Sequence, residues 1–151
     1  MSHLSEFETE FTDKQALIRA LCRVGFTLDQ IETFTIPRRI VGYHSDEVKV
    51  GHIIIKKQNT GIPSDIGWEE KGGKFIYHGD DYNYGALGYG TNKRYDTAWQ
   101  VNLLNYYNLE KSKMALEARG ILCTECTDAK GRLQLRAKFK VKAKTTLRTS
   151  L

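Results

Sequence analysis

The stretch SDIGWEEKGGKFIYH, residues 64–78, decides the fold class of this chain. Two segments that favour strand, Ser64 to Glu69 and Lys74 to His78, flank the run Lys71-Gly72-Gly73. Because glycine adopts positive φ angles without strain, the stretch predicts an antiparallel hairpin closed by a tight turn. A buried strand is predicted before it, over Val48 to Lys57, where three consecutive isoleucines are followed by turn residues at 59–63.

Apolar residues at helical spacing predict a first helix over Asp13 to Val24. Thr12 is the expected N-cap, with Gln15 three residues later in the position of a capping box. Gly25 follows the last apolar position and is expected to end the helix.

A second helix is predicted over Arg94 to Arg119, ended by Gly120, with a candidate break at Asn105 or Asn108. The remaining expected elements are strands: His3 to Phe11, an edge strand over Thr33 to His44 that contains Pro37, and a final hairpin of Ile121 to Thr127 with Arg132 to Lys142. This order predicts an α+β fold, a mainly antiparallel sheet with two helices packed on one face.

The length of 151 residues suits one domain, which we expect to cover 1–144, with a basic C-terminal tail at 145–151. No apolar run approaches the roughly 20 residues of a membrane-spanning helix. The first residues lack the pattern of a secretory signal, and three cysteines are too few for a disulfide framework. We therefore expect a soluble protein of a cytoplasm, either cellular or of an infected cell, or of a plastid stroma, without a cofactor.

The charge is distributed unevenly along the chain. Of the 23 basic residues, eight follow Asp128 and no acidic residue does, which leaves 15 basic and 18 acidic residues, a balance of −3, in the preceding part. A localised positive charge of this kind indicates a partner with negative charge.

The last strand carries most of this charge. Strict alternation places one set of residues on an apolar face, namely Leu133, Leu135, Ala137, Phe139 and Val141. The opposite face presents Arg136, Lys138, Lys140 and Lys142, about 6.6–6.8 Å apart given the rise of a strand. That spacing is near the spacing of phosphates in a nucleic-acid strand. Lysines also protect exposed strands against edge-to-edge aggregation, which is the alternative interpretation.

A loop rich in glycine, tyrosine and asparagine is predicted over Gly79 to Asn92. Its tyrosines and the two cations that follow are candidate binding residues: Tyr82, Tyr84, Tyr89, Lys93 and Arg94. Tyrosines beside cations are suited to stacking on bases or to a protein interface. Alternatively, the loop folds back over the sheet with its tyrosines half buried.

Two groups of residues have side chains that are suited to catalysis or metal binding, but each lacks the further groups that the function requires. His78 with Asp80 and Asp81 offers a base or hard-metal ligands, but no nucleophile accompanies them, and we interpret them as a polar turn at a strand end. Cys123 and Cys126 have the spacing of a zinc half-site, yet no second pair exists, and a strand points residues three apart to opposite faces. We therefore expect neither enzymatic activity nor a metal.

Several of these segments resemble one family along nearly the whole chain. They are the helix end Gly25-Phe26, the strands Asp65-Ile66-Gly67-Trp68 and Phe75-Ile76-Tyr77, the helix from Tyr106-Tyr107 to Gly120-Ile121, and the hairpin Asp128-x-x-Gly131. Together they resemble the hypothetical chloroplast open reading frame 35 family of plastids, cyanobacteria, some other bacteria and phages, which has no established activity. The resemblance implies a fold and a compartment, and it supplies no catalytic residue.

From these features we expect a small non-catalytic binding protein, an accessory or assembly factor. It would contact an unidentified protein or another acidic macromolecule through the Tyr/Gly-rich loop and the basic C-terminal strand. The alternative is a nucleic-acid-binding protein that uses the same basic strand and tyrosines.

Overall fold

The computed structural model describes residues 4–7, 11–42, 48–80 and 94–138. The chain divides into two compact units, Met1–Tyr107 and Asn108–Leu151, which we describe separately as unit 1 and unit 2. The boundary falls within one helix. The expected single domain over 1–144 stays a prediction.

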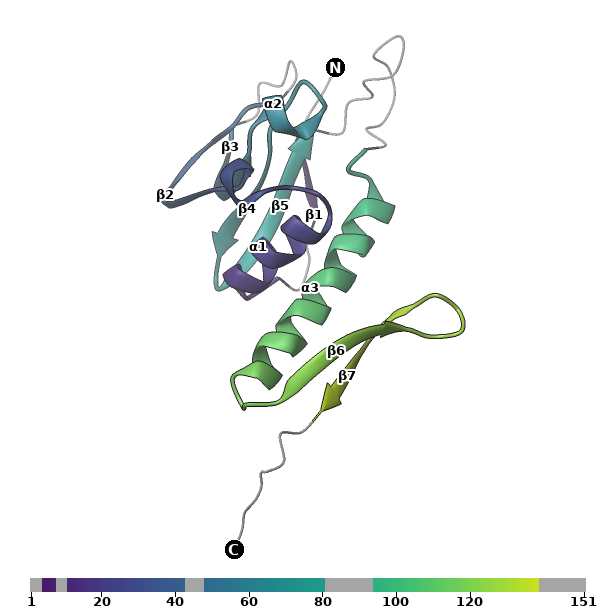
Figure 1. Ribbon diagram of the computed structural model, residues 1–151. Helices are drawn as coiled ribbons and strands as arrows, with labels where there is room; N and C mark the ends of the chain where they lie inside the picture. The colour runs from purple at the N-terminus through teal and green to yellow at the C-terminus, as the bar shows by residue number, and fades with distance from the viewer. Residues whose placement is uncertain (1–3, 8–10, 43–47, 81–93, 139–151) are drawn as a thin grey trace, which may run out of the picture. The chain divides into compact units, whose positions relative to one another are not determined.

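Unit 1 is built around a five-stranded sheet in which every neighbouring pair is antiparallel, with the order β1-β5-β4-β3-β2 (Figure 1). The strands are β1 (Leu4–Phe7), β2 (Glu32–Ile40), β3 (Lys49–Ile55), β4 (Ile66–Lys71) and β5 (Lys74–Asp80). The predicted α+β class with a mainly antiparallel sheet is confirmed.

The hairpin of β4 and β5 forms as predicted. Its two-residue turn consists of Gly72 and Gly73, with φ angles of 56° and 79°, the positive values that this kind of tight turn requires. Trp68 pairs with Tyr77 across the strands, and their ring centroids lie 5.4 Å apart. Both side chains are buried, so this pair forms part of the core.

The two strands on the other side of the hairpin differ in burial. Ile53, Ile54 and Ile55 of β3 are completely buried, as expected for a strand covered on both faces. Beyond it, β2 is the edge strand, and its register with β3 shifts between Thr33 and Arg38. The shift includes Pro37, which has no N–H to donate and is tolerated at an edge or a bulge.

The first helix, α1, spans Lys14–Arg23, and its predicted N-cap is wrong by one residue. Asp13 caps the helix, since its Oδ1 accepts a hydrogen bond from the Ala16 backbone N–H at 3.0 Å. The Thr12 backbone N–H instead donates to the hydroxyl of Tyr107 at 2.9 Å. The short helices η1 (Leu28–Gln30) and α2 (Lys57–Thr60) follow, the second replacing part of the predicted turn.

The long helix α3 spans Thr97–Glu117 without a break, so neither Asn105 nor Asn108 interrupts it. Gly120 follows with a φ angle of 76°, as predicted for the residue that ends the helix. Figure 1 shows α1 and the first half of α3 on the same side of the sheet. Phe11, in the segment before α1, contacts Tyr107 of α3, with ring centroids 4.8 Å apart.

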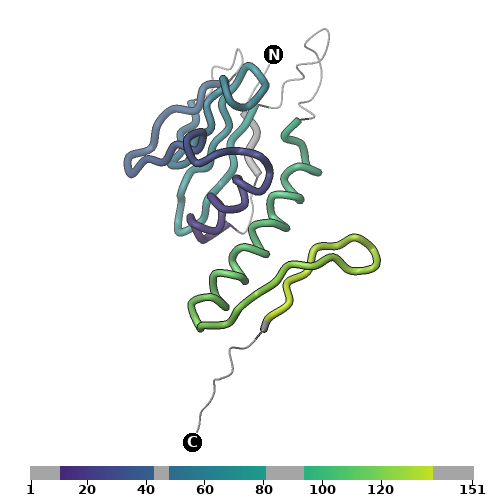
Figure 2. The backbone as a smooth tube through the Cα atoms, viewed as in Figure 1, coloured from purple at the N-terminus to yellow at the C-terminus, as the bar shows by residue number. Residues whose placement is uncertain are grey.

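Unit 2 consists of the end of α3 and the hairpin of β6 (Leu122–Thr127) and β7 (Leu133–Lys138), which Figure 2 traces in green to yellow. The two strands pair antiparallel from Leu122 opposite Lys138 to Thr127 opposite Leu133, so the predicted second hairpin is confirmed. None of the helices in the described ranges combines the length and the apolarity needed to cross a bilayer.

Candidate functional sites

The structure describes three of the nine predicted binding residues. Arg94 and Arg136 are described with their side chains, and Lys138 by its backbone. The remaining six lie outside the described residues: Tyr82, Tyr84, Tyr89, Lys93, Lys140 and Lys142. The Tyr/Gly-rich loop and the end of the basic strand therefore stay predictions.

The β6–β7 hairpin has two chemically different faces. Residues that pair directly in a sheet share a face, so the pairs Thr124–Arg136 and Leu122–Lys138 lie on one face. We call this face, made of Leu122, Thr124, Cys126, Gln134, Arg136 and position 138, the cationic face. The opposite face carries Leu133, Leu135 and Ala137, which confirms the predicted alternation for the described part of the strand.

An ion pair ties the opposite face to the helix of unit 2. The Lys113 Nζ on α3 lies 3.1 Å from the Glu125 Oε2 on β6. Glu125 pairs with Leu135, so it belongs to the face opposite the cationic one. The pair fixes which face of the hairpin turns toward the helix, and the cationic face lies on the other side.

The cationic face combines exposed apolar and positive groups. Leu122 is 54% exposed, and Thr124, Gln134 and Arg136 are also exposed. Within the described part of the chain, Arg136 makes no ion pair. The cationic face thus presents an apolar side chain next to a positive charge, and Leu133 on the opposite face is also 41% exposed.

The turn of this hairpin is held by one carboxylate. Asp128 Oδ1 accepts the backbone N–H groups of Lys130 and Arg132 at 2.9 and 2.8 Å, and Oδ2 lies 2.7 Å from the Arg132 Nε. The Arg132 backbone N–H is the main reason why the pKa of Asp128 lies below its ordinary value. The charged aspartate therefore closes the turn and fixes the strand register.

The described polar residues at the end of β5 are buried. His78 is fully buried, and its Nε2 lies 2.9 Å from the Glu69 Oε1 on the neighbouring strand. Asp80 is also buried, at 1% exposure, while Asp81 lies outside the described residues. The described residues contain no group of three or more His, Cys, Asp or Glu placed to hold a metal ion.

The pairing of β6 also decides the arrangement of the two cysteines. Cys123 pairs with Ala137 and Cys126 with Gln134, so the thiols lie on opposite faces of the hairpin. The predicted opposite orientation is confirmed, and both thiols are free.

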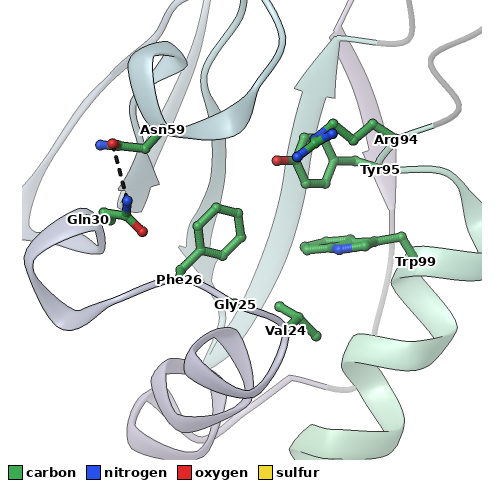
Figure 3. A pocket seen from close by; sticks show the side chains of 8 residues that line it. All are labelled: Val24, Gly25, Phe26, Gln30, Asn59, Arg94, Tyr95 and Trp99. Carbon is green, nitrogen blue, oxygen red and sulfur yellow. Dashed lines mark hydrogen bonds between the residues drawn. The ribbon is translucent and has the colours of Figure 1, made fainter.

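Unit 1 contains a cavity of about 390 Å³ that the sequence did not reveal. Its wall comes from three segments: Val24, Gly25, Phe26 and Gln30 after α1, Asn59 on α2, and Arg94, Tyr95 and Trp99 at the start of α3. Figure 3 shows Phe26 between the Gln30–Asn59 pair on one side and Tyr95 with Trp99 on the other. Of the three predicted binding residues that the structure describes, Arg94 alone lines it.

The α3 side of the cavity is aromatic and positively charged. Tyr95 and Trp99 make an edge contact, with ring centroids 4.8 Å apart. The Arg94 guanidinium carbon lies 5.9 Å from the centre of the Tyr95 ring. A Cβ atom at Gly61 would stand 3.0 Å from that same carbon, so glycine leaves room for the guanidinium.

Tyr95 anchors this wall to α2. Its hydroxyl donates a hydrogen bond to the Thr60 carbonyl oxygen. Burial raises the pKa of Tyr95 above its ordinary value, and the neighbouring Arg94 opposes this effect in part. Tyr95 therefore stays neutral at physiological pH and acts as a structural donor beneath the cavity.

The opposite side of the cavity is lined by two amides. The Gln30 Nε2 donates to the Asn59 Oδ1 at 3.4 Å, while the Gln30 Oε1 accepts the Thr27 backbone N–H at 3.0 Å. Among the described residues, the Asn59 Nδ2 has no hydrogen-bond partner. The amide pair thus retains donor capacity.

The sequence carried no local signal for this cavity. Phe26 follows a helix end, Asn59 lies in a predicted turn, and Trp99 occupies a helical position that suits a core residue. Only the folding of three distant segments brings them together. The sequence feature that comes closest to indicating the cavity is an arginine and a tryptophan, Arg94 and Trp99, near the start of the predicted helix.

Comparison with protein-family models, with curated proteins and with solved structures finds no match for the chain. The resemblance to the hypothetical chloroplast open reading frame 35 family stays a prediction.

Proposed function

We propose that this chain is a non-catalytic binding protein, an accessory or assembly factor that contacts an acidic protein partner through the cationic face of its C-terminal hairpin. The observation that carries the proposal is the juxtaposition of Leu122, 54% exposed, with the exposed Arg136 on one face of a two-stranded hairpin. Such hairpins are only marginally stable alone, and a partner that covers the leucine would stabilise this one.

The exposed leucine favours a protein partner over nucleic acid. A strand that binds only phosphates gains its affinity from its cations, and an apolar side chain among them contributes little. A protein interface gains affinity from apolar burial at its centre and from charges around it. The alternative function, nucleic-acid binding, is supported by the regular spacing of Arg136, Lys138, Lys140 and Lys142 in the sequence.

Two variants of the full chain separate these functions. In the apolar variant Leu122 becomes Ser, and in the charge variant Arg136 and Lys138 become Glu. The proposal is tested by affinity purification from the native source, followed by a binding titration with the partner that is recovered. We expect each variant to weaken binding at least about tenfold, as for a central interface residue.

The control is Arg39→Glu, a charge reversal at an exposed position of β2 in unit 1. This variant should bind the partner as tightly as the unaltered chain. In parallel, labelled single- and double-stranded nucleic acids are titrated by fluorescence polarisation at low and high salt. Binding to nucleic acid that depends on salt and on Arg136, but not on Leu122, would replace the proposed function with the alternative.

A further inference from the structure

We propose that the cavity of unit 1 is a nucleotide-binding site, in which aromatic side chains hold the base and Arg94 holds the phosphate. The proposal does not depend on the function of the hairpin, because every lining residue belongs to unit 1. The volume of about 390 Å³ falls in the range of small-molecule sites, roughly 300–1,000 Å³.

The aromatic residues provide the surface for a planar ring. Phe26 and Trp99 are both half-buried, so each is held by packing while part of its ring faces the cavity. Trp99 is further fixed by its edge contact with the buried Tyr95 (Figure 3). Stacking on rigid aromatic rings is the main way in which proteins hold a base without reading its sequence.

The two amides border the cavity on the far side of Phe26, where they offer hydrogen bonds to a ligand that reaches past this ring (Figure 3). Gln30 is oriented by the Thr27 backbone N–H and by Asn59, so its position is fixed before a ligand arrives. The remaining N–H groups of this pair are donors, which suit the ring nitrogens and carbonyl oxygens of a base.

The Arg94 guanidinium provides the charge that a phosphate requires. It is exposed and lies against Gly61 at the edge of the cavity, where it already interacts with the Tyr95 side chain. Arginine binds phosphate with paired, charge-assisted hydrogen bonds. No carboxylate lines the cavity among the described residues, so nothing there opposes an anion.

The test uses the intrinsic fluorescence of the full chain. Of the two tryptophans, Trp68 is fully buried in the sheet, and Trp99 lines the cavity. The chain is titrated with each of the four nucleoside monophosphates, with excitation at the red edge of tryptophan absorption. Binding of a nucleotide should quench the fluorescence of Trp99. We expect at least one nucleotide to bind about tenfold more tightly than its nucleoside, which lacks the phosphate, and than ribose 5-phosphate, which lacks the base.

Two variants and one control assign the binding to this site. Arg94→Gln should weaken nucleotide binding about 10- to 100-fold and leave binding of the nucleoside unchanged. Trp99→Phe should abolish the quenching while calorimetry still detects binding, because phenylalanine retains a stacking ring. Arg39→Gln, an exposed cation on β2, should behave like the unaltered chain.

A tetranucleotide of RNA in the same assay distinguishes a nucleic-acid segment from a free nucleotide as the natural ligand. If it binds more tightly than mononucleotides and with the same dependence on Arg94, the natural ligand is a nucleic-acid segment; weaker binding indicates a free nucleotide. The proposal is overturned if no nucleotide binds at millimolar concentration, if ribose 5-phosphate binds as tightly as nucleotides, or if Arg94→Gln has no effect.

Discussion

At the scale of single residues, Asp65 connects three chain segments through one buried carboxylate. Its Oδ1 accepts the Lys57 backbone N–H at 2.8 Å, and its Oδ2 accepts the Val41 backbone N–H at 3.0 Å. The residue itself is 2% exposed at the start of β4. One side chain thus fixes the end of β2 and the start of α2 relative to the central strands.

Replacing Asp65 with Ala should reduce the free energy of unfolding by about 2–4 kcal/mol, because two backbone donors lose a charged acceptor. Urea unfolding measures the change. The control is Glu70→Ala, which removes an exposed carboxylate from the same part of the chain and should alter stability by less than about 0.5 kcal/mol. Equal effects of the two variants would contradict the assigned role of Asp65.

Asp128 predicts a pH dependence of the hairpin turn. Its pKa is lowered in the folded chain, so its contribution to stability is present above pH 3.8, the ordinary value, and is lost as the pH falls through the lower folded value. An NMR titration should place the Asp128 midpoint below 3.8, and Asp128→Asn should remove the transition from the Lys130 and Arg132 amide signals. A midpoint above 3.8 would exclude this arrangement.

At the scale of the elements, α3 helps to cap α1. The Tyr107 hydroxyl accepts the backbone N–H groups of Thr12 and Asp13, each at 2.9 Å, and the side chain is 1% exposed. The start of a helix leaves backbone donors without partners inside the helix, and here a distant tyrosine satisfies two N–H groups at and just before the cap. One phenolic oxygen thus links the start of α1 to α3.

Tyr107→Phe should destabilise the chain by about 1–3 kcal/mol, since it removes this acceptor and leaves the packing of the ring intact. Hydrogen exchange of the Thr12 and Asp13 amides should accelerate in the same variant. Tyr106→Phe is the matched control, one residue earlier on the helix, and should change neither quantity. If both variants behave alike, the hydroxyl has no capping role.

Sequence-based prediction succeeded for features that depend on local geometry and failed for those that depend on contacts between distant segments. The Gly72-Gly73 hairpin and the Gly120 helix end depend on local backbone geometry, so local sequence predicts them. The cap of α1 was misassigned because the Thr12 hydroxyl lies beside the Tyr107 hydroxyl, 95 residues away, and the next residue, Asp13, supplies the capping oxygen. The cavity was missed for the same reason, as its three segments acquire a common chemistry only on folding.

At the scale of the whole molecule, the two units differ in how many of their described residues are buried. Unit 1 contains completely buried residues on α1, β3 and β4, among them Leu17, Ile54 and Trp68. In the described part of unit 2, the only buried residues are Glu110 and Ile121. A segment with so little buried surface belongs to the least stable part of a protein.

Hydrogen exchange followed by mass spectrometry should therefore show faster exchange in Leu122–Thr127 than in Lys49–Ile55, although both form strands. We expect the protection of the hairpin to increase when the protein partner binds, while β3 keeps its rate. Equal protection of the two strands in the free chain would show that unit 2 has a stability that its burial does not explain.

The two thiols of β6 have a further consequence. Cys123 and Cys126 are three residues apart on one strand, so their Cα atoms are separated by about 10 Å. A disulfide requires roughly 4.4–6.8 Å, and the two side chains point to opposite faces. The bond between them therefore forms only when the strand has opened. With an oxidant that reacts faster than the strand recloses, its rate of formation measures how often the hairpin unfolds. Disulfide formation between these two cysteines thus reports the opening of the surface that we assign to partner binding.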